Sequence, residues 1–250
     1  LMSEDIITAA MVVIGDEILS GRTREGNAHH LARILTEAGI DLREVRVVGD
    51  DEPAIVEAVN ALRARNTYLF TSGGIGPTHD DITADAIGVA LGLPVDKDAR
   101  AMEILTAHYD RRGEPFTEAR QRMARMPEGA ILIDNPITAA PGFIVGNVHV
   151  MAGVPAIFQA MLDRVLPTLR AGRKLASQAI YCRFGEGVIG APLGAIQNAH
   201  PRTVIGSYPR YEDGRHWAEI VVRSADADAL EAAADAVRAM LEELEVKHGE

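Results

Sequence analysis

The stretch TSGGIGPTHDDIT, residues 71–83, combines three glycines with two adjacent aspartates. It follows the short apolar run 67–70, which is typical of a buried strand, and precedes 84–91, whose apolar positions recur at helical spacing. The stretch is therefore predicted to be a strand-to-helix turn. Such turns are where open α/β sheets bind their ligands.

The glycines of this turn suit an anionic ligand. Gly73, Gly74 and Gly76 let the backbone take positive φ and approach a ligand closely, and bare amides before a helix N-terminus cradle a phosphate. Asp80 and Asp81 can lie beside a phosphate if a divalent cation lies between them. A purely structural turn is the alternative, because glycines also end strands and Asp or Thr often caps a helix. Neither a dinucleotide fingerprint nor a P-loop is present, because the third glycine and a Gly-Lys-Ser/Thr sequence are missing.

Composition excludes several other classes of protein. Acidic residues outnumber basic ones by 36 to 25 over 250 residues, giving a net charge of −11, which argues against sequence-independent nucleic-acid binding. The single cysteine, Cys182, excludes an internal disulfide, fits a reducing compartment and is expected to be buried and inert. No apolar run is long enough to span a membrane, and the N-terminus lacks a signal-peptide pattern. A cytoplasmic protein without a membrane or nucleic-acid partner is expected.

The first 170 residues predict a three-layer α/β/α domain with a mostly parallel sheet, because strand and helix patterns alternate. The predicted strands are 10–15, 43–49, 67–72, 131–133, 143–145 and 148–151. The predicted helices are 27–39, the segment after Pro53, 84–91, the basic segment 98–125 and the segment from Pro155 to about Leu169. Residues 126–130 are expected to be a loop, and Gly146-Asn147 a hairpin turn at a sheet edge.

The remaining residues have a different order of strands and helices and therefore predict a second domain. The two predicted domains span residues 1–172 and 173–250. The order of strand, helix, two strands and helix in the second domain indicates a small α+β unit. Gly206–Pro209 is expected to be a hairpin turn. The final helix, 226–244, is rich in alanine, which permits close packing and favours a homo-oligomer. This unit is expected to be an accessory and assembly domain.

Three carboxylates follow three successive strands of the predicted sheet. These are Glu17, Asp50 and Asp81, and they can converge because the carboxyl ends of parallel strands share one edge. Hard oxygen ligands in this arrangement suit Mg²⁺ or Mn²⁺ with retained waters and substrate phosphates. Each acid alone could equally cap a helix or lie on the surface. The eight histidines form no comparable cluster.

The segment 98–125 is also unusually basic. A solvated helix face explains such arginines, but a local cationic patch would suit an anionic ligand. The arginines concerned are Arg100, Arg111, Arg112, Arg120, Arg122 and Arg125.

Further motifs carry a family resemblance. They are GDEILSG (15–21), Asn27, VGD (48–50), RRG (111–113), PEGA (127–130), NP (135–136), APGF (140–143) and AGVP (152–155). Together with the glycine-rich turn, they resemble the MoaB/Mog-type molybdopterin-binding fold. The similarity is to the N-terminal part of the competence/damage-inducible protein A (CinA) family and to the molybdopterin-binding-like domain of FAD synthases. It is strong over residues 10–169 and weaker over 175–245, which resembles a small KH-like region.

The resemblance implies a set of site residues. Asp50 and Asp81 match the acidic positions on which molybdopterin-handling relatives depend. Gly73, Gly74, Gly76 and Thr78 match the phosphate-binding loop, and the other candidate ligand contacts are Asp80, Asn27, Gly153 and Pro155. CinA-like domains are associated with metal-dependent hydrolysis of ADP-ribose, and the FAD synthase domain with hydrolysis of FAD. The family's Asn-Arg-Lys-Gln stretch is replaced here by residues 120–123, RQRM, which puts ligand contacts there in doubt.

Two classes of function follow. The first is a hydrolase, a divalent-metal-dependent pyrophosphatase acting on ADP-ribose, FAD or a similar dinucleotide, with Glu17, Asp50 and Asp81 as metal ligands or base. The second is a non-catalytic module that binds molybdopterin or a nucleotide, and adenylyl transfer in molybdenum cofactor biosynthesis is a further alternative. The acidic trio favours the enzyme, whereas the altered basic stretch favours the binding module. Mg²⁺ or Mn²⁺ is the expected cofactor, with molybdopterin a possible ligand.

Overall fold

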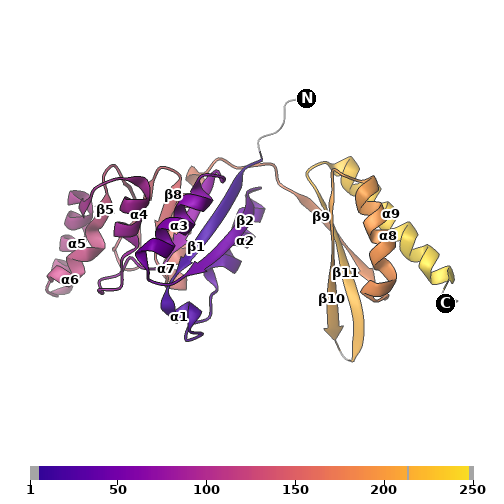
Figure 1. Cartoon of the computed structure of the whole chain (residues 1–250), viewed down its shortest axis with the longest axis horizontal. Helices are drawn as coiled ribbons and strands as arrows, with labels where there is room; N and C mark the ends of the chain where they lie inside the picture. The colour runs from indigo at the N-terminus through magenta and orange to yellow at the C-terminus, as the bar shows by residue number, and fades with distance from the viewer. Residues whose placement is uncertain (1–5, 213, 248–250) are drawn as a thin grey trace. The chain divides into compact units, whose positions relative to one another are not determined.

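The computed structural model describes residues 6–212 and 214–247. The chain divides into two compact units, the first ending at Gly172 and the second beginning at Arg173 (Figure 1). Each unit has a core of its own. They are therefore described separately.

The first unit is built on a six-stranded sheet in the order β2-β1-β3-β8-β7-β6. Its strands are β1 (Thr8–Ile14), β2 (Asp41–Val48), β3 (Tyr68–Ser72), β6 (Ile131–Ile133), β7 (Gly142–Val145) and β8 (Val148–Met151). The first four strands in this order are parallel, and β7 and β6 are antiparallel to their neighbours. The mostly parallel sheet that the sequence predicts is confirmed.

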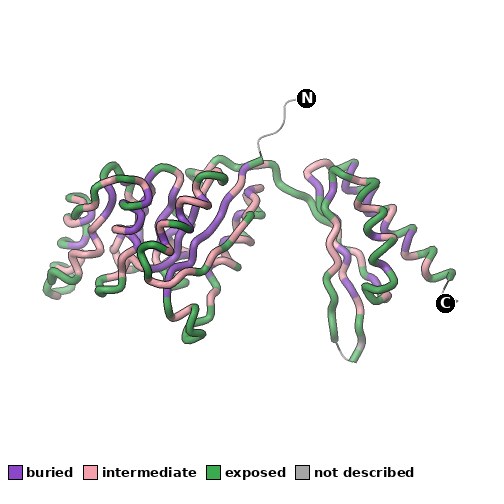
Figure 2. Tube along the Cα trace, viewed as in Figure 1, coloured by how far each residue is buried: buried purple, intermediate pink, exposed green. Residues whose placement is uncertain are grey.

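Helices cover both faces of this sheet (Figure 1). One face packs against α2 (Asn27–Glu37) and α7 (Pro155–Val165), and the other against α3 (Glu52–Arg63), α4 (Thr83–Leu91) and α5 (Ala99–Arg112). Successive residues of a strand point to opposite faces, so Met11 enters one core and Val12 the other, and both are fully buried. Figure 2 shows the resulting run of buried residues along the central strands. The three-layer α/β/α architecture follows.

The loops at the carboxyl edge of the sheet lead into the helices of the first unit. Asp51 caps α3, since its side chain accepts a hydrogen bond from the N–H of Ala54 at 3.0 Å. The short helix α1 (Asp16–Leu19) follows β1 directly, and α4 follows the glycine-rich loop after β3. The predicted strand-to-helix turn at residues 71–83 is confirmed, because β3 ends at Ser72 and α4 begins at Thr83.

The basic segment 98–125 is not one continuous helix, contrary to the prediction. Helix α5 ends at Arg112 because Gly113 takes the left-handed conformation, with φ 64°. The short α6 (Glu118–Gln121) and a 3₁₀ turn, η1 (Arg122–Ala124), follow. The predicted loop at 126–130 is also partly wrong, since β5 (Arg125–Pro127) pairs antiparallel with β4 (Val95–Lys97).

The predicted hairpin at Gly146-Asn147 forms, but it does not lie at a sheet edge. Val145 pairs with Val148 across the turn, and Gly146 has φ 58°. Strand β8 lies between β3 and β7, and all four of its residues are buried. The edge position belongs to β6 instead. A second 3₁₀ turn, η2 (Leu166–Thr168), ends the last helix of the unit.

The second unit packs two helices against a three-stranded antiparallel sheet in the order β10-β11-β9. Its elements are β9 (Ala176–Cys182), α8 (Glu186–Ala199), β10 (Val204–Glu212), β11 (Arg215–Ser224) and α9 (Ala227–Lys247). The core joins Ile220 and Val222 of the sheet to Leu193 and Val237 of the helices. Cys182 is buried in this core, and burial raises the pKa of its thiol.

One expectation for this unit is wrong. Gly206–Pro209 is not a turn but part of β10, where Pro209 pairs with Ala218. Proline is tolerated there because β10 is an edge strand and one side of it needs no N–H donor. In the alanine-rich helix α9, Ala233 and Ala234 are fully buried within the unit, whereas Ala232 and Ala239 are exposed, so the predicted homo-oligomer stays a prediction. Among the described helices, none combines the length and apolar character needed to cross a membrane.

Candidate functional site

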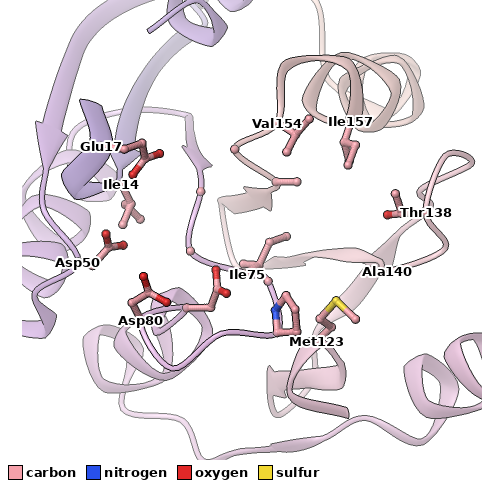
Figure 3. A pocket seen from close by; sticks show the side chains of 18 of the residues that line it. Ile14, Glu17, Asp50, Ile75, Asp80, Met123, Thr138, Ala140, Val154 and Ile157 are labelled. Atoms are coloured by element: carbon pink, nitrogen blue, oxygen red, sulfur yellow. The ribbon is translucent and has the colours of Figure 1, made fainter. Parts of the chain in front are cut away.

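A pocket of about 560 Å³ lies at the carboxyl edge of the parallel strands (Figure 3). It is lined by the loops after β1, β2, β3 and β8, by the start of α7 and by the loop between β6 and β7. The candidate residues among its lining are Glu17, Asp50, Gly73, Gly74, Gly76, Asp80, Asp81, Gly153 and Pro155. Thr78 and Asn27 are not among the lining residues.

The floor of the pocket is made of backbone in close contact. A Cβ on Gly73 would lie 2.1 Å from the carbonyl oxygen of Ile14, and Gly73 has φ +108°. A Cβ on Gly153 would lie 3.2 Å from the Cα of Gly73. The N–H of Gly73 donates to the carbonyl oxygen of Met151 at 3.1 Å. The ends of β1, β3 and β8 can approach this closely only because glycine has no side chain.

The loop after β3 offers backbone donors to the pocket. Within the described residues, the N–H groups of Gly74, Ile75 and Gly76 have no hydrogen-bond partner. Thr83 fixes the base of the loop, because its hydroxyl donates to the carbonyl oxygen of Gly73 at 2.9 Å and its N–H donates to that of Gly74 at 3.0 Å. Sequence reasoning gave Thr83 no role, although its place at the start of α4 is a signal for such a contact.

Asp50 and Asp16 join the loops after β2 and β1. The carboxylate of Asp50 accepts from the N–H of Asp16 at 3.0 Å, and the N–H of Asp50 donates to the Asp16 carboxylate at 3.3 Å. Gly49 permits this approach, since a Cβ there would lie 2.4 Å from Asp16 Oδ1. Burial raises the pKa of Asp50, and the negative charges of Asp16, Glu17 and Asp80 add to the rise. The loops therefore hold an unneutralised negative charge at the pocket.

Asp81 has a structural contact as well as a place in the pocket. Its Oδ2 atom accepts from the N–H of Thr78 at 2.8 Å and from the Thr78 hydroxyl at 2.5 Å. A Cβ on Gly76 would lie 2.6 Å from this same oxygen. Thr78 thus shapes the loop by holding Asp81.

Asn27 lies beside the pocket rather than in its lining. Its side-chain Nδ2 donates to Ser72 Oγ at 2.7 Å and to the carbonyl oxygen of Gly153 at 2.8 Å. These bonds tie the start of α2 to the ends of β3 and β8. Asn27 borders an adjoining cavity of about 40 Å³ that shares Glu17 and Gly153 with the main pocket.

The acids share the pocket without forming a ready-made metal centre. Glu17, Asp50 and Asp81 all line it, yet the described residues contain no group of three or more His, Cys, Asp or Glu side chains that could hold a metal ion. Mg²⁺ is nevertheless often held by one or two carboxylates with waters and substrate phosphates. Burial is the main cause of the raised pKa of Asp50, and the negative charges of Asp16, Glu17 and Asp80 add to it, so a cation would offset part of the rise. The donor set therefore fits a cation that arrives with a phosphorylated ligand.

The arginines of segment 98–125 do not enter this pocket. Four of them are paired with acids, namely Arg100 with Asp98, Arg112 and Arg120 with Glu114, and Arg125 with Asp85. Arg122 lies beside the loop, with Nη2 3.4 Å from the carbonyl oxygen of Asp81. The local cationic patch is thus not part of the pocket lining, which among the described residues holds four acids and no Arg, Lys or His.

The opposite wall of the pocket is apolar. Figure 3 shows Glu17, Asp50 and Asp80 on one side and Val154, Ile157 and Thr138 on the other. The apolar side also contains Ile75, Met123 and Ala140. Sequence reasoning gave no role to Thr138 and Ile157, because the loop between β6 and β7 and the start of α7 reach the site only in the folded state.

Comparisons with known proteins cover both units. Residues 10–171 match the family described as "Probable molybdopterin binding domain", and residues 174–250 match the "FAD synthase, middle domain". A protein of Aeropyrum pernix is 32% identical over 244 residues, covering 93% of this chain and 90% of its own length. A protein of Caldivirga maquilingensis is 37% identical over 195 residues, covering 76% and 75%. The solved structure of a CinA protein of unknown function from Thermoplasma acidophilum aligns with a TM-score of 0.60 at 31% identity, covering 64% of this chain and 98% of that one.

Proposed function

The chain belongs to the molybdopterin-binding domain family of the MoaB/Mog and CinA type, and from this premise we propose that its pocket binds a phosphorylated dinucleotide with a divalent cation and hydrolyses the diphosphate. ADP-ribose, FAD or a similar dinucleotide is the proposed substrate. The catalytic residues in this proposal are Asp50, Asp81 and Glu17.

One observation carries the proposal. Four carboxylates line the pocket beside the unpartnered N–H groups of residues 74–76, and among the described lining residues there is no Arg, Lys or His. Backbone amides at the start of a helix favour a phosphate, whereas carboxylates repel it. A phosphate can therefore bind here with high affinity only if a cation neutralises the acidic side. A bare phosphate receptor would have no need of four carboxylates.

The metal ligands would come from Glu17 and Asp81, with Asp80 beside them, and Asp50 would remain unligated. A bound Mg²⁺ or Mn²⁺ would supply charge neutralisation to the phosphate oxygens and lower the pKa of a bound water.

The chain's own groups account for the rest of the proposed chemistry. The amides of residues 74–76 stabilise negative charge on the phosphate. Asp50 lines the pocket beside these amides and would serve as the base. Water attacks phosphorus, the bond to the bridging oxygen breaks, and Asp50 takes the proton of the attacking water. The apolar wall holds the ring end of the substrate and limits access of bulk water.

The experiment is a panel of ADP-ribose, FAD, NAD and molybdopterin incubated with and without Mg²⁺ or Mn²⁺, followed by product analysis. We expect metal-dependent release of nucleoside monophosphate from at least one dinucleotide. Asp50→Asn should lose this turnover, whereas Asp51→Asn at the neighbouring exposed position should keep it, because asparagine also caps α3. Turnover without added metal in chelator-treated protein, or equal activity of both variants, would overturn the proposal.

A non-catalytic binding module is the second candidate. It is favoured by the contact of Thr78 with Asp81 and by the lack, among the described residues, of a ready-made metal centre. This candidate predicts saturable binding of molybdopterin or a dinucleotide with full recovery of intact ligand. The same panel separates the two candidates, because calorimetry measures binding and chromatography measures turnover.

A further inference from the structure

The apolar wall of the pocket has few polar groups that could recognise a ligand. Ile75, Met123, Val154 and Ile157 provide aliphatic surface, and among the described lining residues no aromatic or basic side chain accompanies them. A flat ring can lie against such surface through its apolar faces, but its edge atoms need polar partners. Among the described lining residues, Asn135 and Thr138 are the polar ones in the loop between β6 and β7, and Figure 3 shows Thr138 on the apolar side.

Asn135 is fully used within its own loop. It is buried, with 4% of its surface exposed. Its Oδ1 accepts from the N–H groups of Ile137 and Thr138 at 3.0 and 3.2 Å. Its Nδ2 donates to Thr138 Oγ1 at 2.6 Å and to the carbonyl oxygen of Ala140 at 2.8 Å. All the hydrogen-bonding groups of this amide are thus occupied, so it orders the loop and offers no free donor to a ligand.

The loop is held in a single conformation by these bonds. Ala139 has φ 62°, the left-handed conformation, which a non-glycine residue adopts at a cost, and its N–H donates to the carbonyl oxygen of Asn135 at 3.1 Å. The position of Thr138 is therefore fixed before any ligand binds.

Thr138, unlike Asn135, can still donate a hydrogen bond to a ligand. Its oxygen accepts the Asn135 amide proton, so its own hydroxyl hydrogen is free to be donated. Thr138 is half-buried and lines the pocket, with its oxygen on the pocket side in Figure 3. We propose that the Thr138 hydroxyl determines ligand specificity by donating a hydrogen bond to an acceptor at the edge of a planar nitrogen heterocycle that lies on the apolar wall.

This inference rests on the proposed function and names the ring end of its substrate. Adenine, flavin and pterin all carry ring-nitrogen or carbonyl acceptors at the ring edge, so they share the required chemistry. The phosphate end contacts the acidic side of the pocket, so a ligand without a ring gains nothing from Thr138. The affinities of ring-bearing and ring-free ligands should then respond differently to a change at this residue.

The test compares Thr138→Val with Thr138→Ser in the full chain. Valine keeps the shape but removes the hydroxyl, and serine keeps the hydroxyl. Calorimetry with Mg²⁺ measures inorganic pyrophosphate as the ring-free probe and ADP, FMN and neopterin monophosphate as ring-bearing probes. We expect Thr138→Val to weaken at least one ring-bearing probe by roughly three- to tenfold, as one net hydrogen bond allows, and to leave pyrophosphate unchanged.

The other possible results distinguish failure of this inference from failure of the proposed function. Restoration of affinity by Thr138→Ser supports the inference, and the ring whose affinity depends on the hydroxyl identifies the substrate class. An unchanged affinity for every ring, or an equal loss for pyrophosphate, overturns it while leaving the proposed function in place. If the wild-type chain binds pyrophosphate but no ring, the inference also fails. If it binds none of the probes, the proposed function itself fails.

Discussion

Asp81 holds its own loop with one carboxylate oxygen while it lines the pocket. We expect Asp81→Asn to abolish metal-dependent turnover, with a loss of roughly 100-fold or more, because the proposed cation loses one of its carboxylate ligands. The asparagine carbonyl oxygen can still accept both bonds from Thr78. The melting temperature should therefore change little, because the loop keeps its shape.

Asp81→Ala is the matched variant for this prediction. It removes the carboxylate and both contacts with Thr78, so it should lose turnover and also about 1–2 kcal/mol of unfolding free energy. Initial rates and thermal melts on both variants separate the two effects. If Asp81→Asn keeps its turnover, Asp81 serves only to hold the loop.

His149 makes the stability of the first unit depend on pH. It is 4% exposed, and its ring contacts Tyr68 and Phe70 in β3. Burial lowers its pKa from 6.5 to about 4. The folded state therefore favours neutral imidazole, and the unfolded state binds the proton first as pH falls. This contribution is complete above pH 6.5 and is lost as pH falls toward 4, a loss of about 3 kcal/mol for the shift given.

Hydrogen exchange in peptides spanning β3 and β8 measures this effect in the first unit. Fluorescence would report the wrong unit, since the single tryptophan, Trp217, lies in β11. His149→Leu keeps an apolar side chain of similar size and cannot be protonated. Between pH 7 and 4.5 it should lose less protection than the wild type does. Equal pH dependence in the two proteins would show that His149 does not control acid stability.

Among the structural elements, the contact between the ends of β3 and β8 shapes the pocket floor. Gly153→Ala would place a Cβ 3.2 Å from the Cα of Gly73, so one of the two loops must shift by a few tenths of an ångström. Because both loops line the pocket, we expect the affinity for Mg²⁺ with pyrophosphate to fall about tenfold, equivalent to about 1.4 kcal/mol. Calorimetry measures the loss.

Gly92→Ala is the control for Gly153→Ala. Gly92 ends α4 with φ +68°, and a Cβ there would meet nothing within 4 Å. The strained backbone should cost about 1–2 kcal/mol of unfolding free energy, without any effect on ligand affinity. If both variants weaken binding in proportion to their loss of stability, the close contact of Gly153 with Gly73 has no specific role in the pocket.

Local signals predicted the elements that position this site. The apolar run before Thr71, the glycines after it and the helical spacing from Ala84 onward gave the strand, loop and helix that the structure confirms. The order of strands placed Glu17, Asp50 and Asp81 at one edge, and all three line one pocket. Their chemical roles stay predictions. These features were predictable because they depend on sequence spacing and on the direction of parallel strands.

Features that depend on long-range pairing were missed. The three-residue strands β4 and β5 are too short to produce a periodic pattern, and each is a strand only because the other pairs with it. Pro209 looked like part of a turn because the edge position of β10 is not visible in the sequence. Thr138 was missed for a related reason, since its hydroxyl is available only because Asn135 bonds the same oxygen.

At the scale of the whole molecule, every residue that lines the pocket belongs to the first unit. The second unit has a core of its own, which α8 and α9 close. We therefore predict that a chain ending after Lys174 binds Mg²⁺ with pyrophosphate or ADP-ribose with the affinity of the full chain. The cut must follow the last packed residues of the first unit.

Gly172 and Arg170 determine where that cut lies. A Cβ on Gly172 would meet the carbonyl oxygen of Gly39 at 2.1 Å, and the N–H of Arg170 donates to Tyr68 Oη at 2.8 Å. A chain that ends before Arg170 lacks both of these contacts and should be less stable for that reason alone. It therefore serves as the negative control. Calorimetry on the full and shortened chains tests ligand binding, and light scattering on the same samples tests the predicted homo-oligomer. If the chain ending after Lys174 keeps its melting transition but loses ligand affinity, residues of the second unit contribute to the site, and the chemistry does not belong to the first unit alone.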